Sequence, residues 1–111
     1  MPATATLEVL AEPTRRRLLD ELRQGERPVH DLVARIGLSQ PAVSKHLRVL
    51  RDAGLVSVRP DGQRRLYRLQ AEPLMELDEW LEPYRRMWRD SLDKLERHLA
   101  EPGSRPTRRR R

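Results

Sequence analysis

Hydrophobic residues in the first half of the chain recur every three or four positions, which is the spacing of an amphipathic helix. The pattern predicts four short helices, and Gly25, Gly37 and Gly54 follow three of them as stop signals. Thr14 is the predicted N-cap of the second helix, and Ser39 is that of the fourth. The helices are predicted over residues 6–11, 14–24, 29–36 and 39–53.

A turn of three or four residues separates the third and fourth predicted helices. Two helices joined in this way form a helix-turn-helix, whose second helix lies in the major groove of DNA. In the fourth helix Val43, Leu47 and Leu50 form the apolar face, so its polar residues point outward. The residues that we expect to contact DNA here are Ser39, Gln40, Pro41, Ser44, Lys45, His46 and Arg48.

These side chains have the chemistry of base and phosphate readers. The amide of Gln40 pairs with adenine, and Arg48 or Lys45 reaches guanine or phosphate. His46 lies at the flank of the apolar face, so a packing or hydrogen-bonding role fits its place as well as a phosphate contact does. The alternative interpretation is an ordinary solvated helix face with Ser39 as a simple N-cap.

Two runs with alternating apolar residues follow, over residues 55–59 and 64–69. Residues 60–63, Pro-Asp-Gly-Gln, are a strong turn signal, so the pattern predicts a two-stranded hairpin. Arginine on a hairpin tip grips phosphate or enters the minor groove, whereas a charged edge that prevents strand aggregation is the alternative. The expected DNA contacts of this wing are Arg59, Gln63, Arg64 and Arg65.

From Glu72 to Leu99 the apolar residues step by three or four throughout, which is typical of a coiled-coil seam. Pro83 lacks a donor N–H and predicts a kink or a restart of this long helix. A partner helix is expected along the seam. The aromatic and Met stripe also leaves open a pocket for an apolar effector, although such stripes usually belong to a core. The expected dimer contacts are Leu77, Trp80, Leu81, Tyr84, Trp88, Leu92 and Leu95, and the effector stripe is Trp80, Tyr84, Met87 and Trp88.

Composition supports a dimer and a polyanionic partner. Only 37% of the 111 residues are hydrophobic and Phe is absent, so one copy has little material for a core. The formal net charge of +6 favours nucleic acid, but part of it lies in the arginine-rich residues 105–111. We therefore expect one DNA-binding and dimerisation domain over residues 1–100 and a basic, disordered tail over residues 101–111.

Several classes of function are excluded or disfavoured. The chain has no Cys, which rules out disulfides and thiolate metal sites. No nucleophile and base occur at a recognisable spacing, so we expect no enzyme and no cofactor. Asp90, Asp93 and His98 fit ion-paired surface groups better than a metal site. The absence of a long apolar stretch or leader pattern predicts a cytoplasmic protein without a membrane partner.

Three stretches resemble the ArsR-type winged-helix regulators, and the resemblance extends over about residues 7–99. It implies a mainly α-helical winged helix-turn-helix, a homodimer formed by the first and last helices, and a wing touching the DNA backbone. It adds Leu7 and Leu10 to the expected dimer contacts. The stretches are residues 12–15 (Glu-Pro-Thr-Arg), 36–47 (Ile-Gly-Leu-Ser-Gln-Pro-Ala-Val-Ser-Lys-His-Leu) and 50–56 (Leu-Arg-Asp-Ala-Gly-Leu-Val).

Many members of that family sense metals through two cysteines in the third helix. Pro28 and His30 hold those positions here, so the resemblance implies a branch that does not sense metals and whose members often repress their own operons. We expect a homodimeric, sequence-specific regulator, most simply a repressor, that binds a palindromic operator in double-stranded DNA. The alternative is a protein-interaction module built from the same scaffold and leucine seam.

Overall fold

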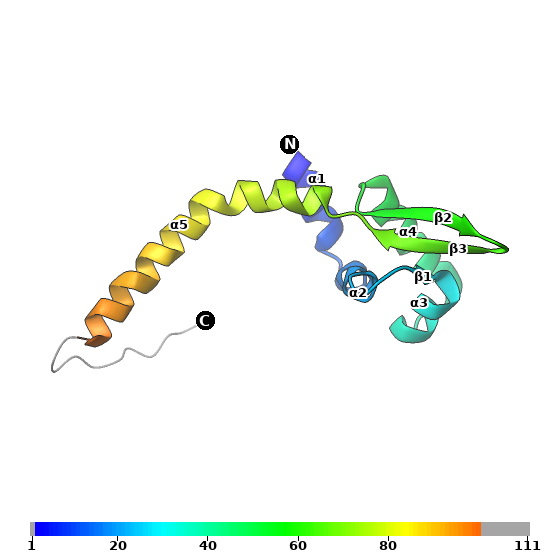
Figure 1. Ribbon diagram of the computed structural model, residues 1–111, viewed down its shortest axis with the longest axis horizontal. Helices are drawn as coiled ribbons and strands as arrows, with labels where there is room; N and C mark the ends of the chain where they lie inside the picture. Colours follow the sequence, from blue (N-terminus) through cyan, green and yellow to red (C-terminus); the bar gives the residue numbers. More distant parts are fainter. Residues whose placement is uncertain (1, 101–111) are drawn as a thin grey trace. The chain divides into compact units, whose positions relative to one another are not determined.

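The structure, a computed structural model, describes residues 2–100, and the predicted tail over residues 101–111 lies outside them. The chain divides into two units, residues 1–79 and 80–111, with the boundary inside the last helix. Figure 1 labels the elements. In chain order they are α1 (Pro2–Leu10), α2 (Pro13–Leu22), β1 (Arg27–Pro28), α3 (Val29–Ile36), α4 (Gln40–Asp52), β2 (Val56–Asp61), β3 (Arg64–Leu69) and α5 (Glu72–Ala100).

The starts and ends of α3 and α4 follow the sequence, but α1 begins four residues earlier than predicted and α2 ends at Leu22, before the predicted Gln24. The hydroxyl of Ser39 accepts the backbone N–H of Ala42 at 3.3 Å, which confirms Ser39 as the N-cap of α4. Gly37 ends α3 at φ 83°, a left-handed conformation that suits glycine. The prediction of Thr14 as the cap of α2 is wrong. The carboxylate of Glu12 accepts the backbone N–H of Arg15 at 3.1 Å instead, because Pro13 fits the first helical position.

The core of the first unit lies between α2, α3, α4 and the sheet. Eleven buried apolar residues form one cluster in it. Burying a Leu or Val side chain stabilises the fold by about 1.5–3 kcal/mol, so this cluster fixes how α4 sits on the domain. The six largest side chains that are completely buried are Leu18, Leu32, Val43, Leu47, Leu50 and Leu55.

The sheet has three antiparallel strands in the order β1-β3-β2, not the two predicted. The missed strand, β1, is only two residues long and includes Pro28, so it shows no alternating pattern. The hairpin turn is also shorter than predicted. Pro60 and Asp61 pair with Arg65 and Arg64 in the ladder, which leaves Gly62 and Gln63 as the two turn residues.

Helix α5 runs from Glu72 to Ala100 as one helix, so the predicted restart at Pro83 does not occur. A proline removes one backbone hydrogen bond, which a helix this long tolerates. None of the α5 residues is buried. From Leu77 the apolar positions continue through Leu81, Tyr84, Trp88, Leu92, Leu95 and Leu99.

Candidate nucleic-acid interface

Helix α4 has a fully buried face and a fully exposed one. Leu47 and Leu50 are 1% and 0% exposed, and they hold the helix against the core. On the opposite side Ser44, Lys45 and Arg48 are exposed. Ser39, Gln40 and Pro41, at the start of the helix, are exposed as well. The arrangement gives a rigid helix whose polar side chains are available to base edges and phosphates.

His46 is the exception among the predicted contacts on α4. It is half-buried, and Arg15 Nε donates a hydrogen bond to His46 Nδ1 at 3.4 Å. Glu12 Oε2 lies 3.8 Å from the same nitrogen. His46 therefore ties α4 to the start of α2, which is the packing and hydrogen-bonding role that its flank position allowed.

A groove of about 390 Å³ lies between α4 and the wing strand β3. Arg48 and Arg51 come from the helix, and Arg65 comes from the strand. Three guanidinium groups around one groove produce a positive surface that suits a phosphate backbone. Ser44, Leu47, Asp52 and Tyr67 complete the lining.

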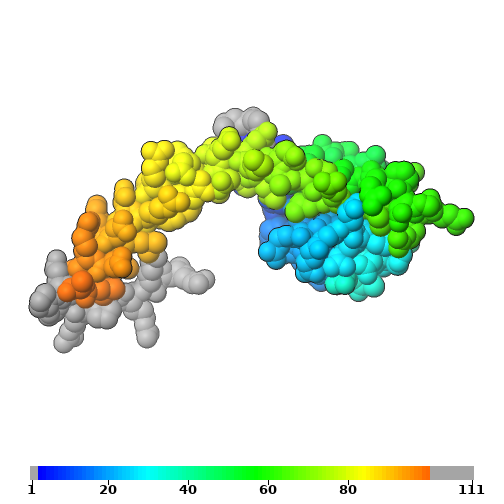
Figure 2. Space-filling model, viewed as in Figure 1, coloured from blue at the N-terminus to red at the C-terminus, as the bar shows by residue number. Residues whose placement is uncertain are grey.

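The wing projects beyond the helices of the first unit (Figures 1 and 2). Its register divides the arginines between two faces, because alternate residues of a strand point to opposite sides. Arg59 lies across from Leu66, and Asp61 lies across from Arg64, so the side chains of these four residues share one face. Arg65 lies on the other face, next to α4.

Two of the wing arginines are held by carboxylates. Arg59 Nε and Nη2 donate to the two carboxylate oxygens of Glu26 at 2.7 and 3.1 Å. Arg64 Nη2 donates to Asp61 Oδ2 at 2.8 Å. These hydrogen bonds are the main reason that the pKa of Glu26 and the pKa of Asp61 lie below their ordinary values. Both carboxylates are therefore ionised at neutral pH.

Sequence reasoning missed Arg51, Glu26 and Asp61 as parts of this surface. Arg51 lies three residues after Arg48 and seven after Ser44, so helical spacing was a usable signal. Glu26 carried no such signal, because it reaches Arg59 only through the sheet that the missed strand β1 builds.

The predicted dimer residues on α5 are exposed or partly exposed. Trp80, Tyr84 and Trp88 are 39%, 45% and 46% exposed, and the rings of Trp80 and Tyr84 pack with centroids 5.1 Å apart. On α1, Leu7 is exposed at 44% and Leu10 is half-buried. These are large apolar side chains that one copy leaves in contact with water.

No group of three or more His, Asp or Glu side chains within residues 2–100 gathers closely enough to hold a metal ion. In the same range, none of the helices has both the length and the hydropathy that crossing a membrane requires.

Helices α2, α3 and α4 pack together, and α3 and α4 form a helix-turn-helix. With the hairpin of β2 and β3 beside them, this arrangement is a winged helix. Comparison with known proteins agrees. The family model for bacterial regulatory proteins of the arsR family matches residues 12–58. A crystal structure of a "possible transcriptional regulator for arsenical resistance" superposes with a TM-score of 0.65 and 46% identity, over 86% of this chain and 96% of that one.

Two curated relatives are similar in sequence. The transcriptional repressor SdpR of Bacillus subtilis is 31% identical over 74 residues, which is 67% of this chain and 82% of the relative. The regulator Rv2034 of Mycobacterium tuberculosis is 43% identical over 70 residues, which is 63% of this chain and 65% of the relative. The matches span less than half of some other curated relatives. The chain belongs to the ArsR family, whose members are DNA-binding transcription regulators and not enzymes.

Proposed function

We propose that this protein is a homodimeric transcription repressor that binds an imperfect palindromic operator with α4 of each copy in the major groove. The observation that carries the proposal is the exposed polar face of α4, held rigid by buried leucines and flanked by the arginine-lined groove. Repression follows if the bound dimer covers promoter sequence that the polymerase needs. The names of relatives such as SdpR, a transcriptional repressor, support this direction.

Base reading is assigned to Gln40, Ser44, Lys45 and Arg48, and backbone contact to the wing. Two copies related by a two-fold axis would place their half-sites about 34 Å apart, one turn of B-DNA. The exposed apolar seam of α5 supports the dimer, since a second seam of the same kind would cover it.

The first experiment is selection of bound duplexes from a random DNA pool at near-physiological salt, where nonspecific contacts are weak. Enrichment of a palindrome with half-sites one turn apart is the expected result. Binding that depends on salt but enriches no sequence would contradict the proposal and would favour the interaction module.

Single variants then test the assigned base readers. Arg48→Ala or Gln40→Ala should lower discrimination at one operator position by about 1–3 kcal/mol. Arg23→Ala is the matched control, because Arg23 is an exposed arginine at the end of α2, outside the proposed interface. Unchanged base preference in Arg48→Ala would remove Arg48 from the readers.

We further propose that the protein belongs to a branch of the family that does not respond to thiophilic metals. The support is chemical, since the chain has no Cys and Pro28 and His30 stand where the resemblance expects thiolates. Titration of the operator complex with Zn²⁺, Ni²⁺ and arsenite should leave the operator Kd unchanged. Release of DNA at micromolar metal would show that other ligands have replaced the thiolates.

A further inference from the structure

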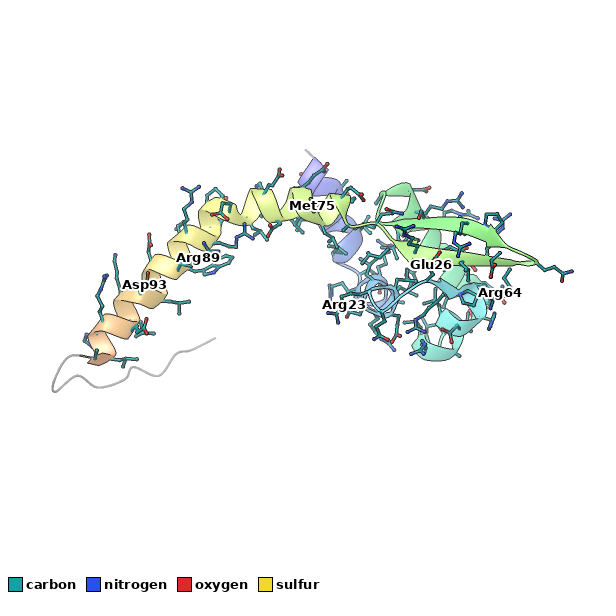
Figure 3. The ribbon with its side chains drawn as sticks, viewed as in Figure 1. Arg23, Glu26, Arg64, Met75, Arg89 and Asp93 are labelled. Carbon is teal, nitrogen blue, oxygen red and sulfur yellow. The ribbon has the colours of Figure 1, made fainter. Side chains whose placement is uncertain are left out.

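Two wing arginines on one face of the hairpin are paired with carboxylates, whereas the arginines around the groove have no such pair within residues 2–100. Arg59 and Arg64 each donate to a carboxylate. Figure 3 labels one member of each pair, Glu26 and Arg64, and Arg64 lies nearer the hairpin tip. Around the groove Asp52 accompanies Arg48, Arg51 and Arg65, yet no hydrogen bond or ion pair joins it to them in the described part of the chain.

Pairing changes what an arginine contributes to DNA binding. A phosphate contact attracts every DNA sequence equally, so each free guanidinium raises the affinity for nonspecific DNA. A carboxylate on the guanidinium competes with phosphate and also repels it. Exposed ion pairs are weak, so a phosphate that is held close to the arginine can displace the carboxylate. In a loosely bound nonspecific duplex the phosphates are not held in place, and displacing the carboxylate adds little to the binding free energy.

The two carboxylates are placed to compete in this way. Glu26 precedes β1 and meets Arg59 with both oxygens, which is the geometry a phosphate would otherwise adopt with that guanidinium. Asp61 is the last residue of β2 and meets Arg64 next to the turn. Arg68, on the same face of β3, also attracts Glu26 electrostatically.

We propose that Glu26 and Asp61 are specificity-determining residues, which occupy Arg59 and Arg64 until an operator phosphate takes the place of the carboxylate. The inference rests on the proposed function. It makes the wing selective without any base contact of its own, because it lowers the affinity for nonspecific DNA more than the affinity for the operator.

The test compares the wild type with the double variant Glu26→Gln/Asp61→Asn. Each protein is titrated with the selected operator and with a scrambled duplex of the same length, over a range of salt concentrations. The variant should bind the scrambled duplex more tightly by on the order of tenfold and the operator by less than about threefold. For the scrambled duplex, the variant's plot of log Kd against log salt should steepen by about 1–2, because two more arginines contact phosphate.

Two controls are needed. One tests whether the change in net charge alone explains the effect, and the other tests whether Glu26 acts through Arg59. Glu8→Gln/Asp20→Asn changes the net charge equally at exposed residues of α1 and α2. Arg59→Ala/Glu26→Gln is compared with Arg59→Ala alone, since Glu26→Gln should change DNA binding much less once Arg59 is gone and only the attraction to Arg68 is left.

The possible results are distinct. An unchanged ratio of operator to scrambled affinity in the double variant would overturn the inference, as would an equal change in the charge control. A wild type that prefers no operator would overturn the proposed function itself, and the inference would fall with it.

Discussion

Leu47 and Trp88 occupy similar places in the patterns of their helices but have different surroundings. Each continues an apolar stripe that recurs every three or four residues. Leu47, in α4, is 1% exposed, whereas Trp88, in the second unit, is 46% exposed. Helices α2, α3 and α4 of the first unit bury their apolar stripes within one chain, whereas α5 has no buried residue. A helical pattern therefore indicates that a face will be buried, without telling which chain buries it.

The largest effect should come from the buried stripe. Leu47→Ala leaves a cavity beneath α4 and should lower the free energy of unfolding by about 2–5 kcal/mol. Urea denaturation followed by circular dichroism measures it. Leu38→Ala, a truncation of the same kind at an exposed position between α3 and α4, should cost far less. Equal losses for the two variants would show that burial within one chain does not set the cost of truncation.

Next in size should be the effect of the exposed stripe on assembly. Trp88→Ala/Leu92→Ala should weaken the dimer at least about tenfold, because large apolar anchors carry most of an interface's affinity. Sedimentation equilibrium measures the dissociation constant. Asp90→Ala/Arg97→Ala is the matched control, since it truncates two residues on the opposite face of α5 and keeps the net charge. A wild-type monomer at high concentration would reject the dimer altogether.

Much of the first unit was predictable because its signals are local. The span of α3, the cap by Ser39 and the stop at Gly37 depend on a few neighbouring residues, and the structure confirms them. Strand β1 was not predictable, because two residues show no alternation and pair only with the distant Leu66 and Tyr67.

The candidate site was also predictable only where its signals are local. The outward face of α4 follows from helical spacing alone, and Ser44 and Arg48 lie where the pattern places them. The pair between Glu26 and Arg59 spans 33 residues of sequence, so it depends on the assembled sheet. The roles of these side chains toward DNA stay predictions until binding is measured.

A smaller loss of stability is expected when the N-cap of α4 is removed. Ser39→Ala removes the side-chain acceptor for the backbone N–H of Ala42 and should lower the free energy of unfolding by about 1 kcal/mol. Thr14→Ala is the control, because Glu12 and not Thr14 caps α2. Both are measured by urea denaturation. If Thr14→Ala were the more costly variant, the cap assignments would be reversed.

The smallest effect should depend on pH. Asp31 accepts hydrogen bonds from Arg27 at 2.9 Å and Arg35 at 3.3 Å, and the bond from Arg27 is the main cause that lowers the pKa of Asp31 below 3.8. The stabilisation is thus complete above pH 3.8 and is lost as the pH falls through the lowered pKa of the folded state. Asp31→Asn should be slightly less stable than the wild type at neutral pH.

Urea midpoints measured across that range check the pH dependence. The difference between wild type and Asp31→Asn should shrink toward zero in acid. Asp20→Asn is the control, as an exposed aspartate on the neighbouring helix α2. A difference that persisted unchanged at the lowest pH would show that the Asp31 carboxylate stabilises the fold by some means other than its charge.

The spacing along α5 has a geometric consequence for the partner helix. The spacing of the apolar residues along the seam repeats every eleven residues. Leu77, Trp88 and Leu99 are eleven residues apart, and so are Leu81 and Leu92. Eleven residues in three turns is about 3.67 per turn, slightly more than the 3.6 of a straight helix, whereas a heptad gives 3.5. Two such seams would run side by side almost straight, with a weak right-handed twist. Removing one residue between Tyr84 and Trp88 would turn the distal half of the seam away by about 100°.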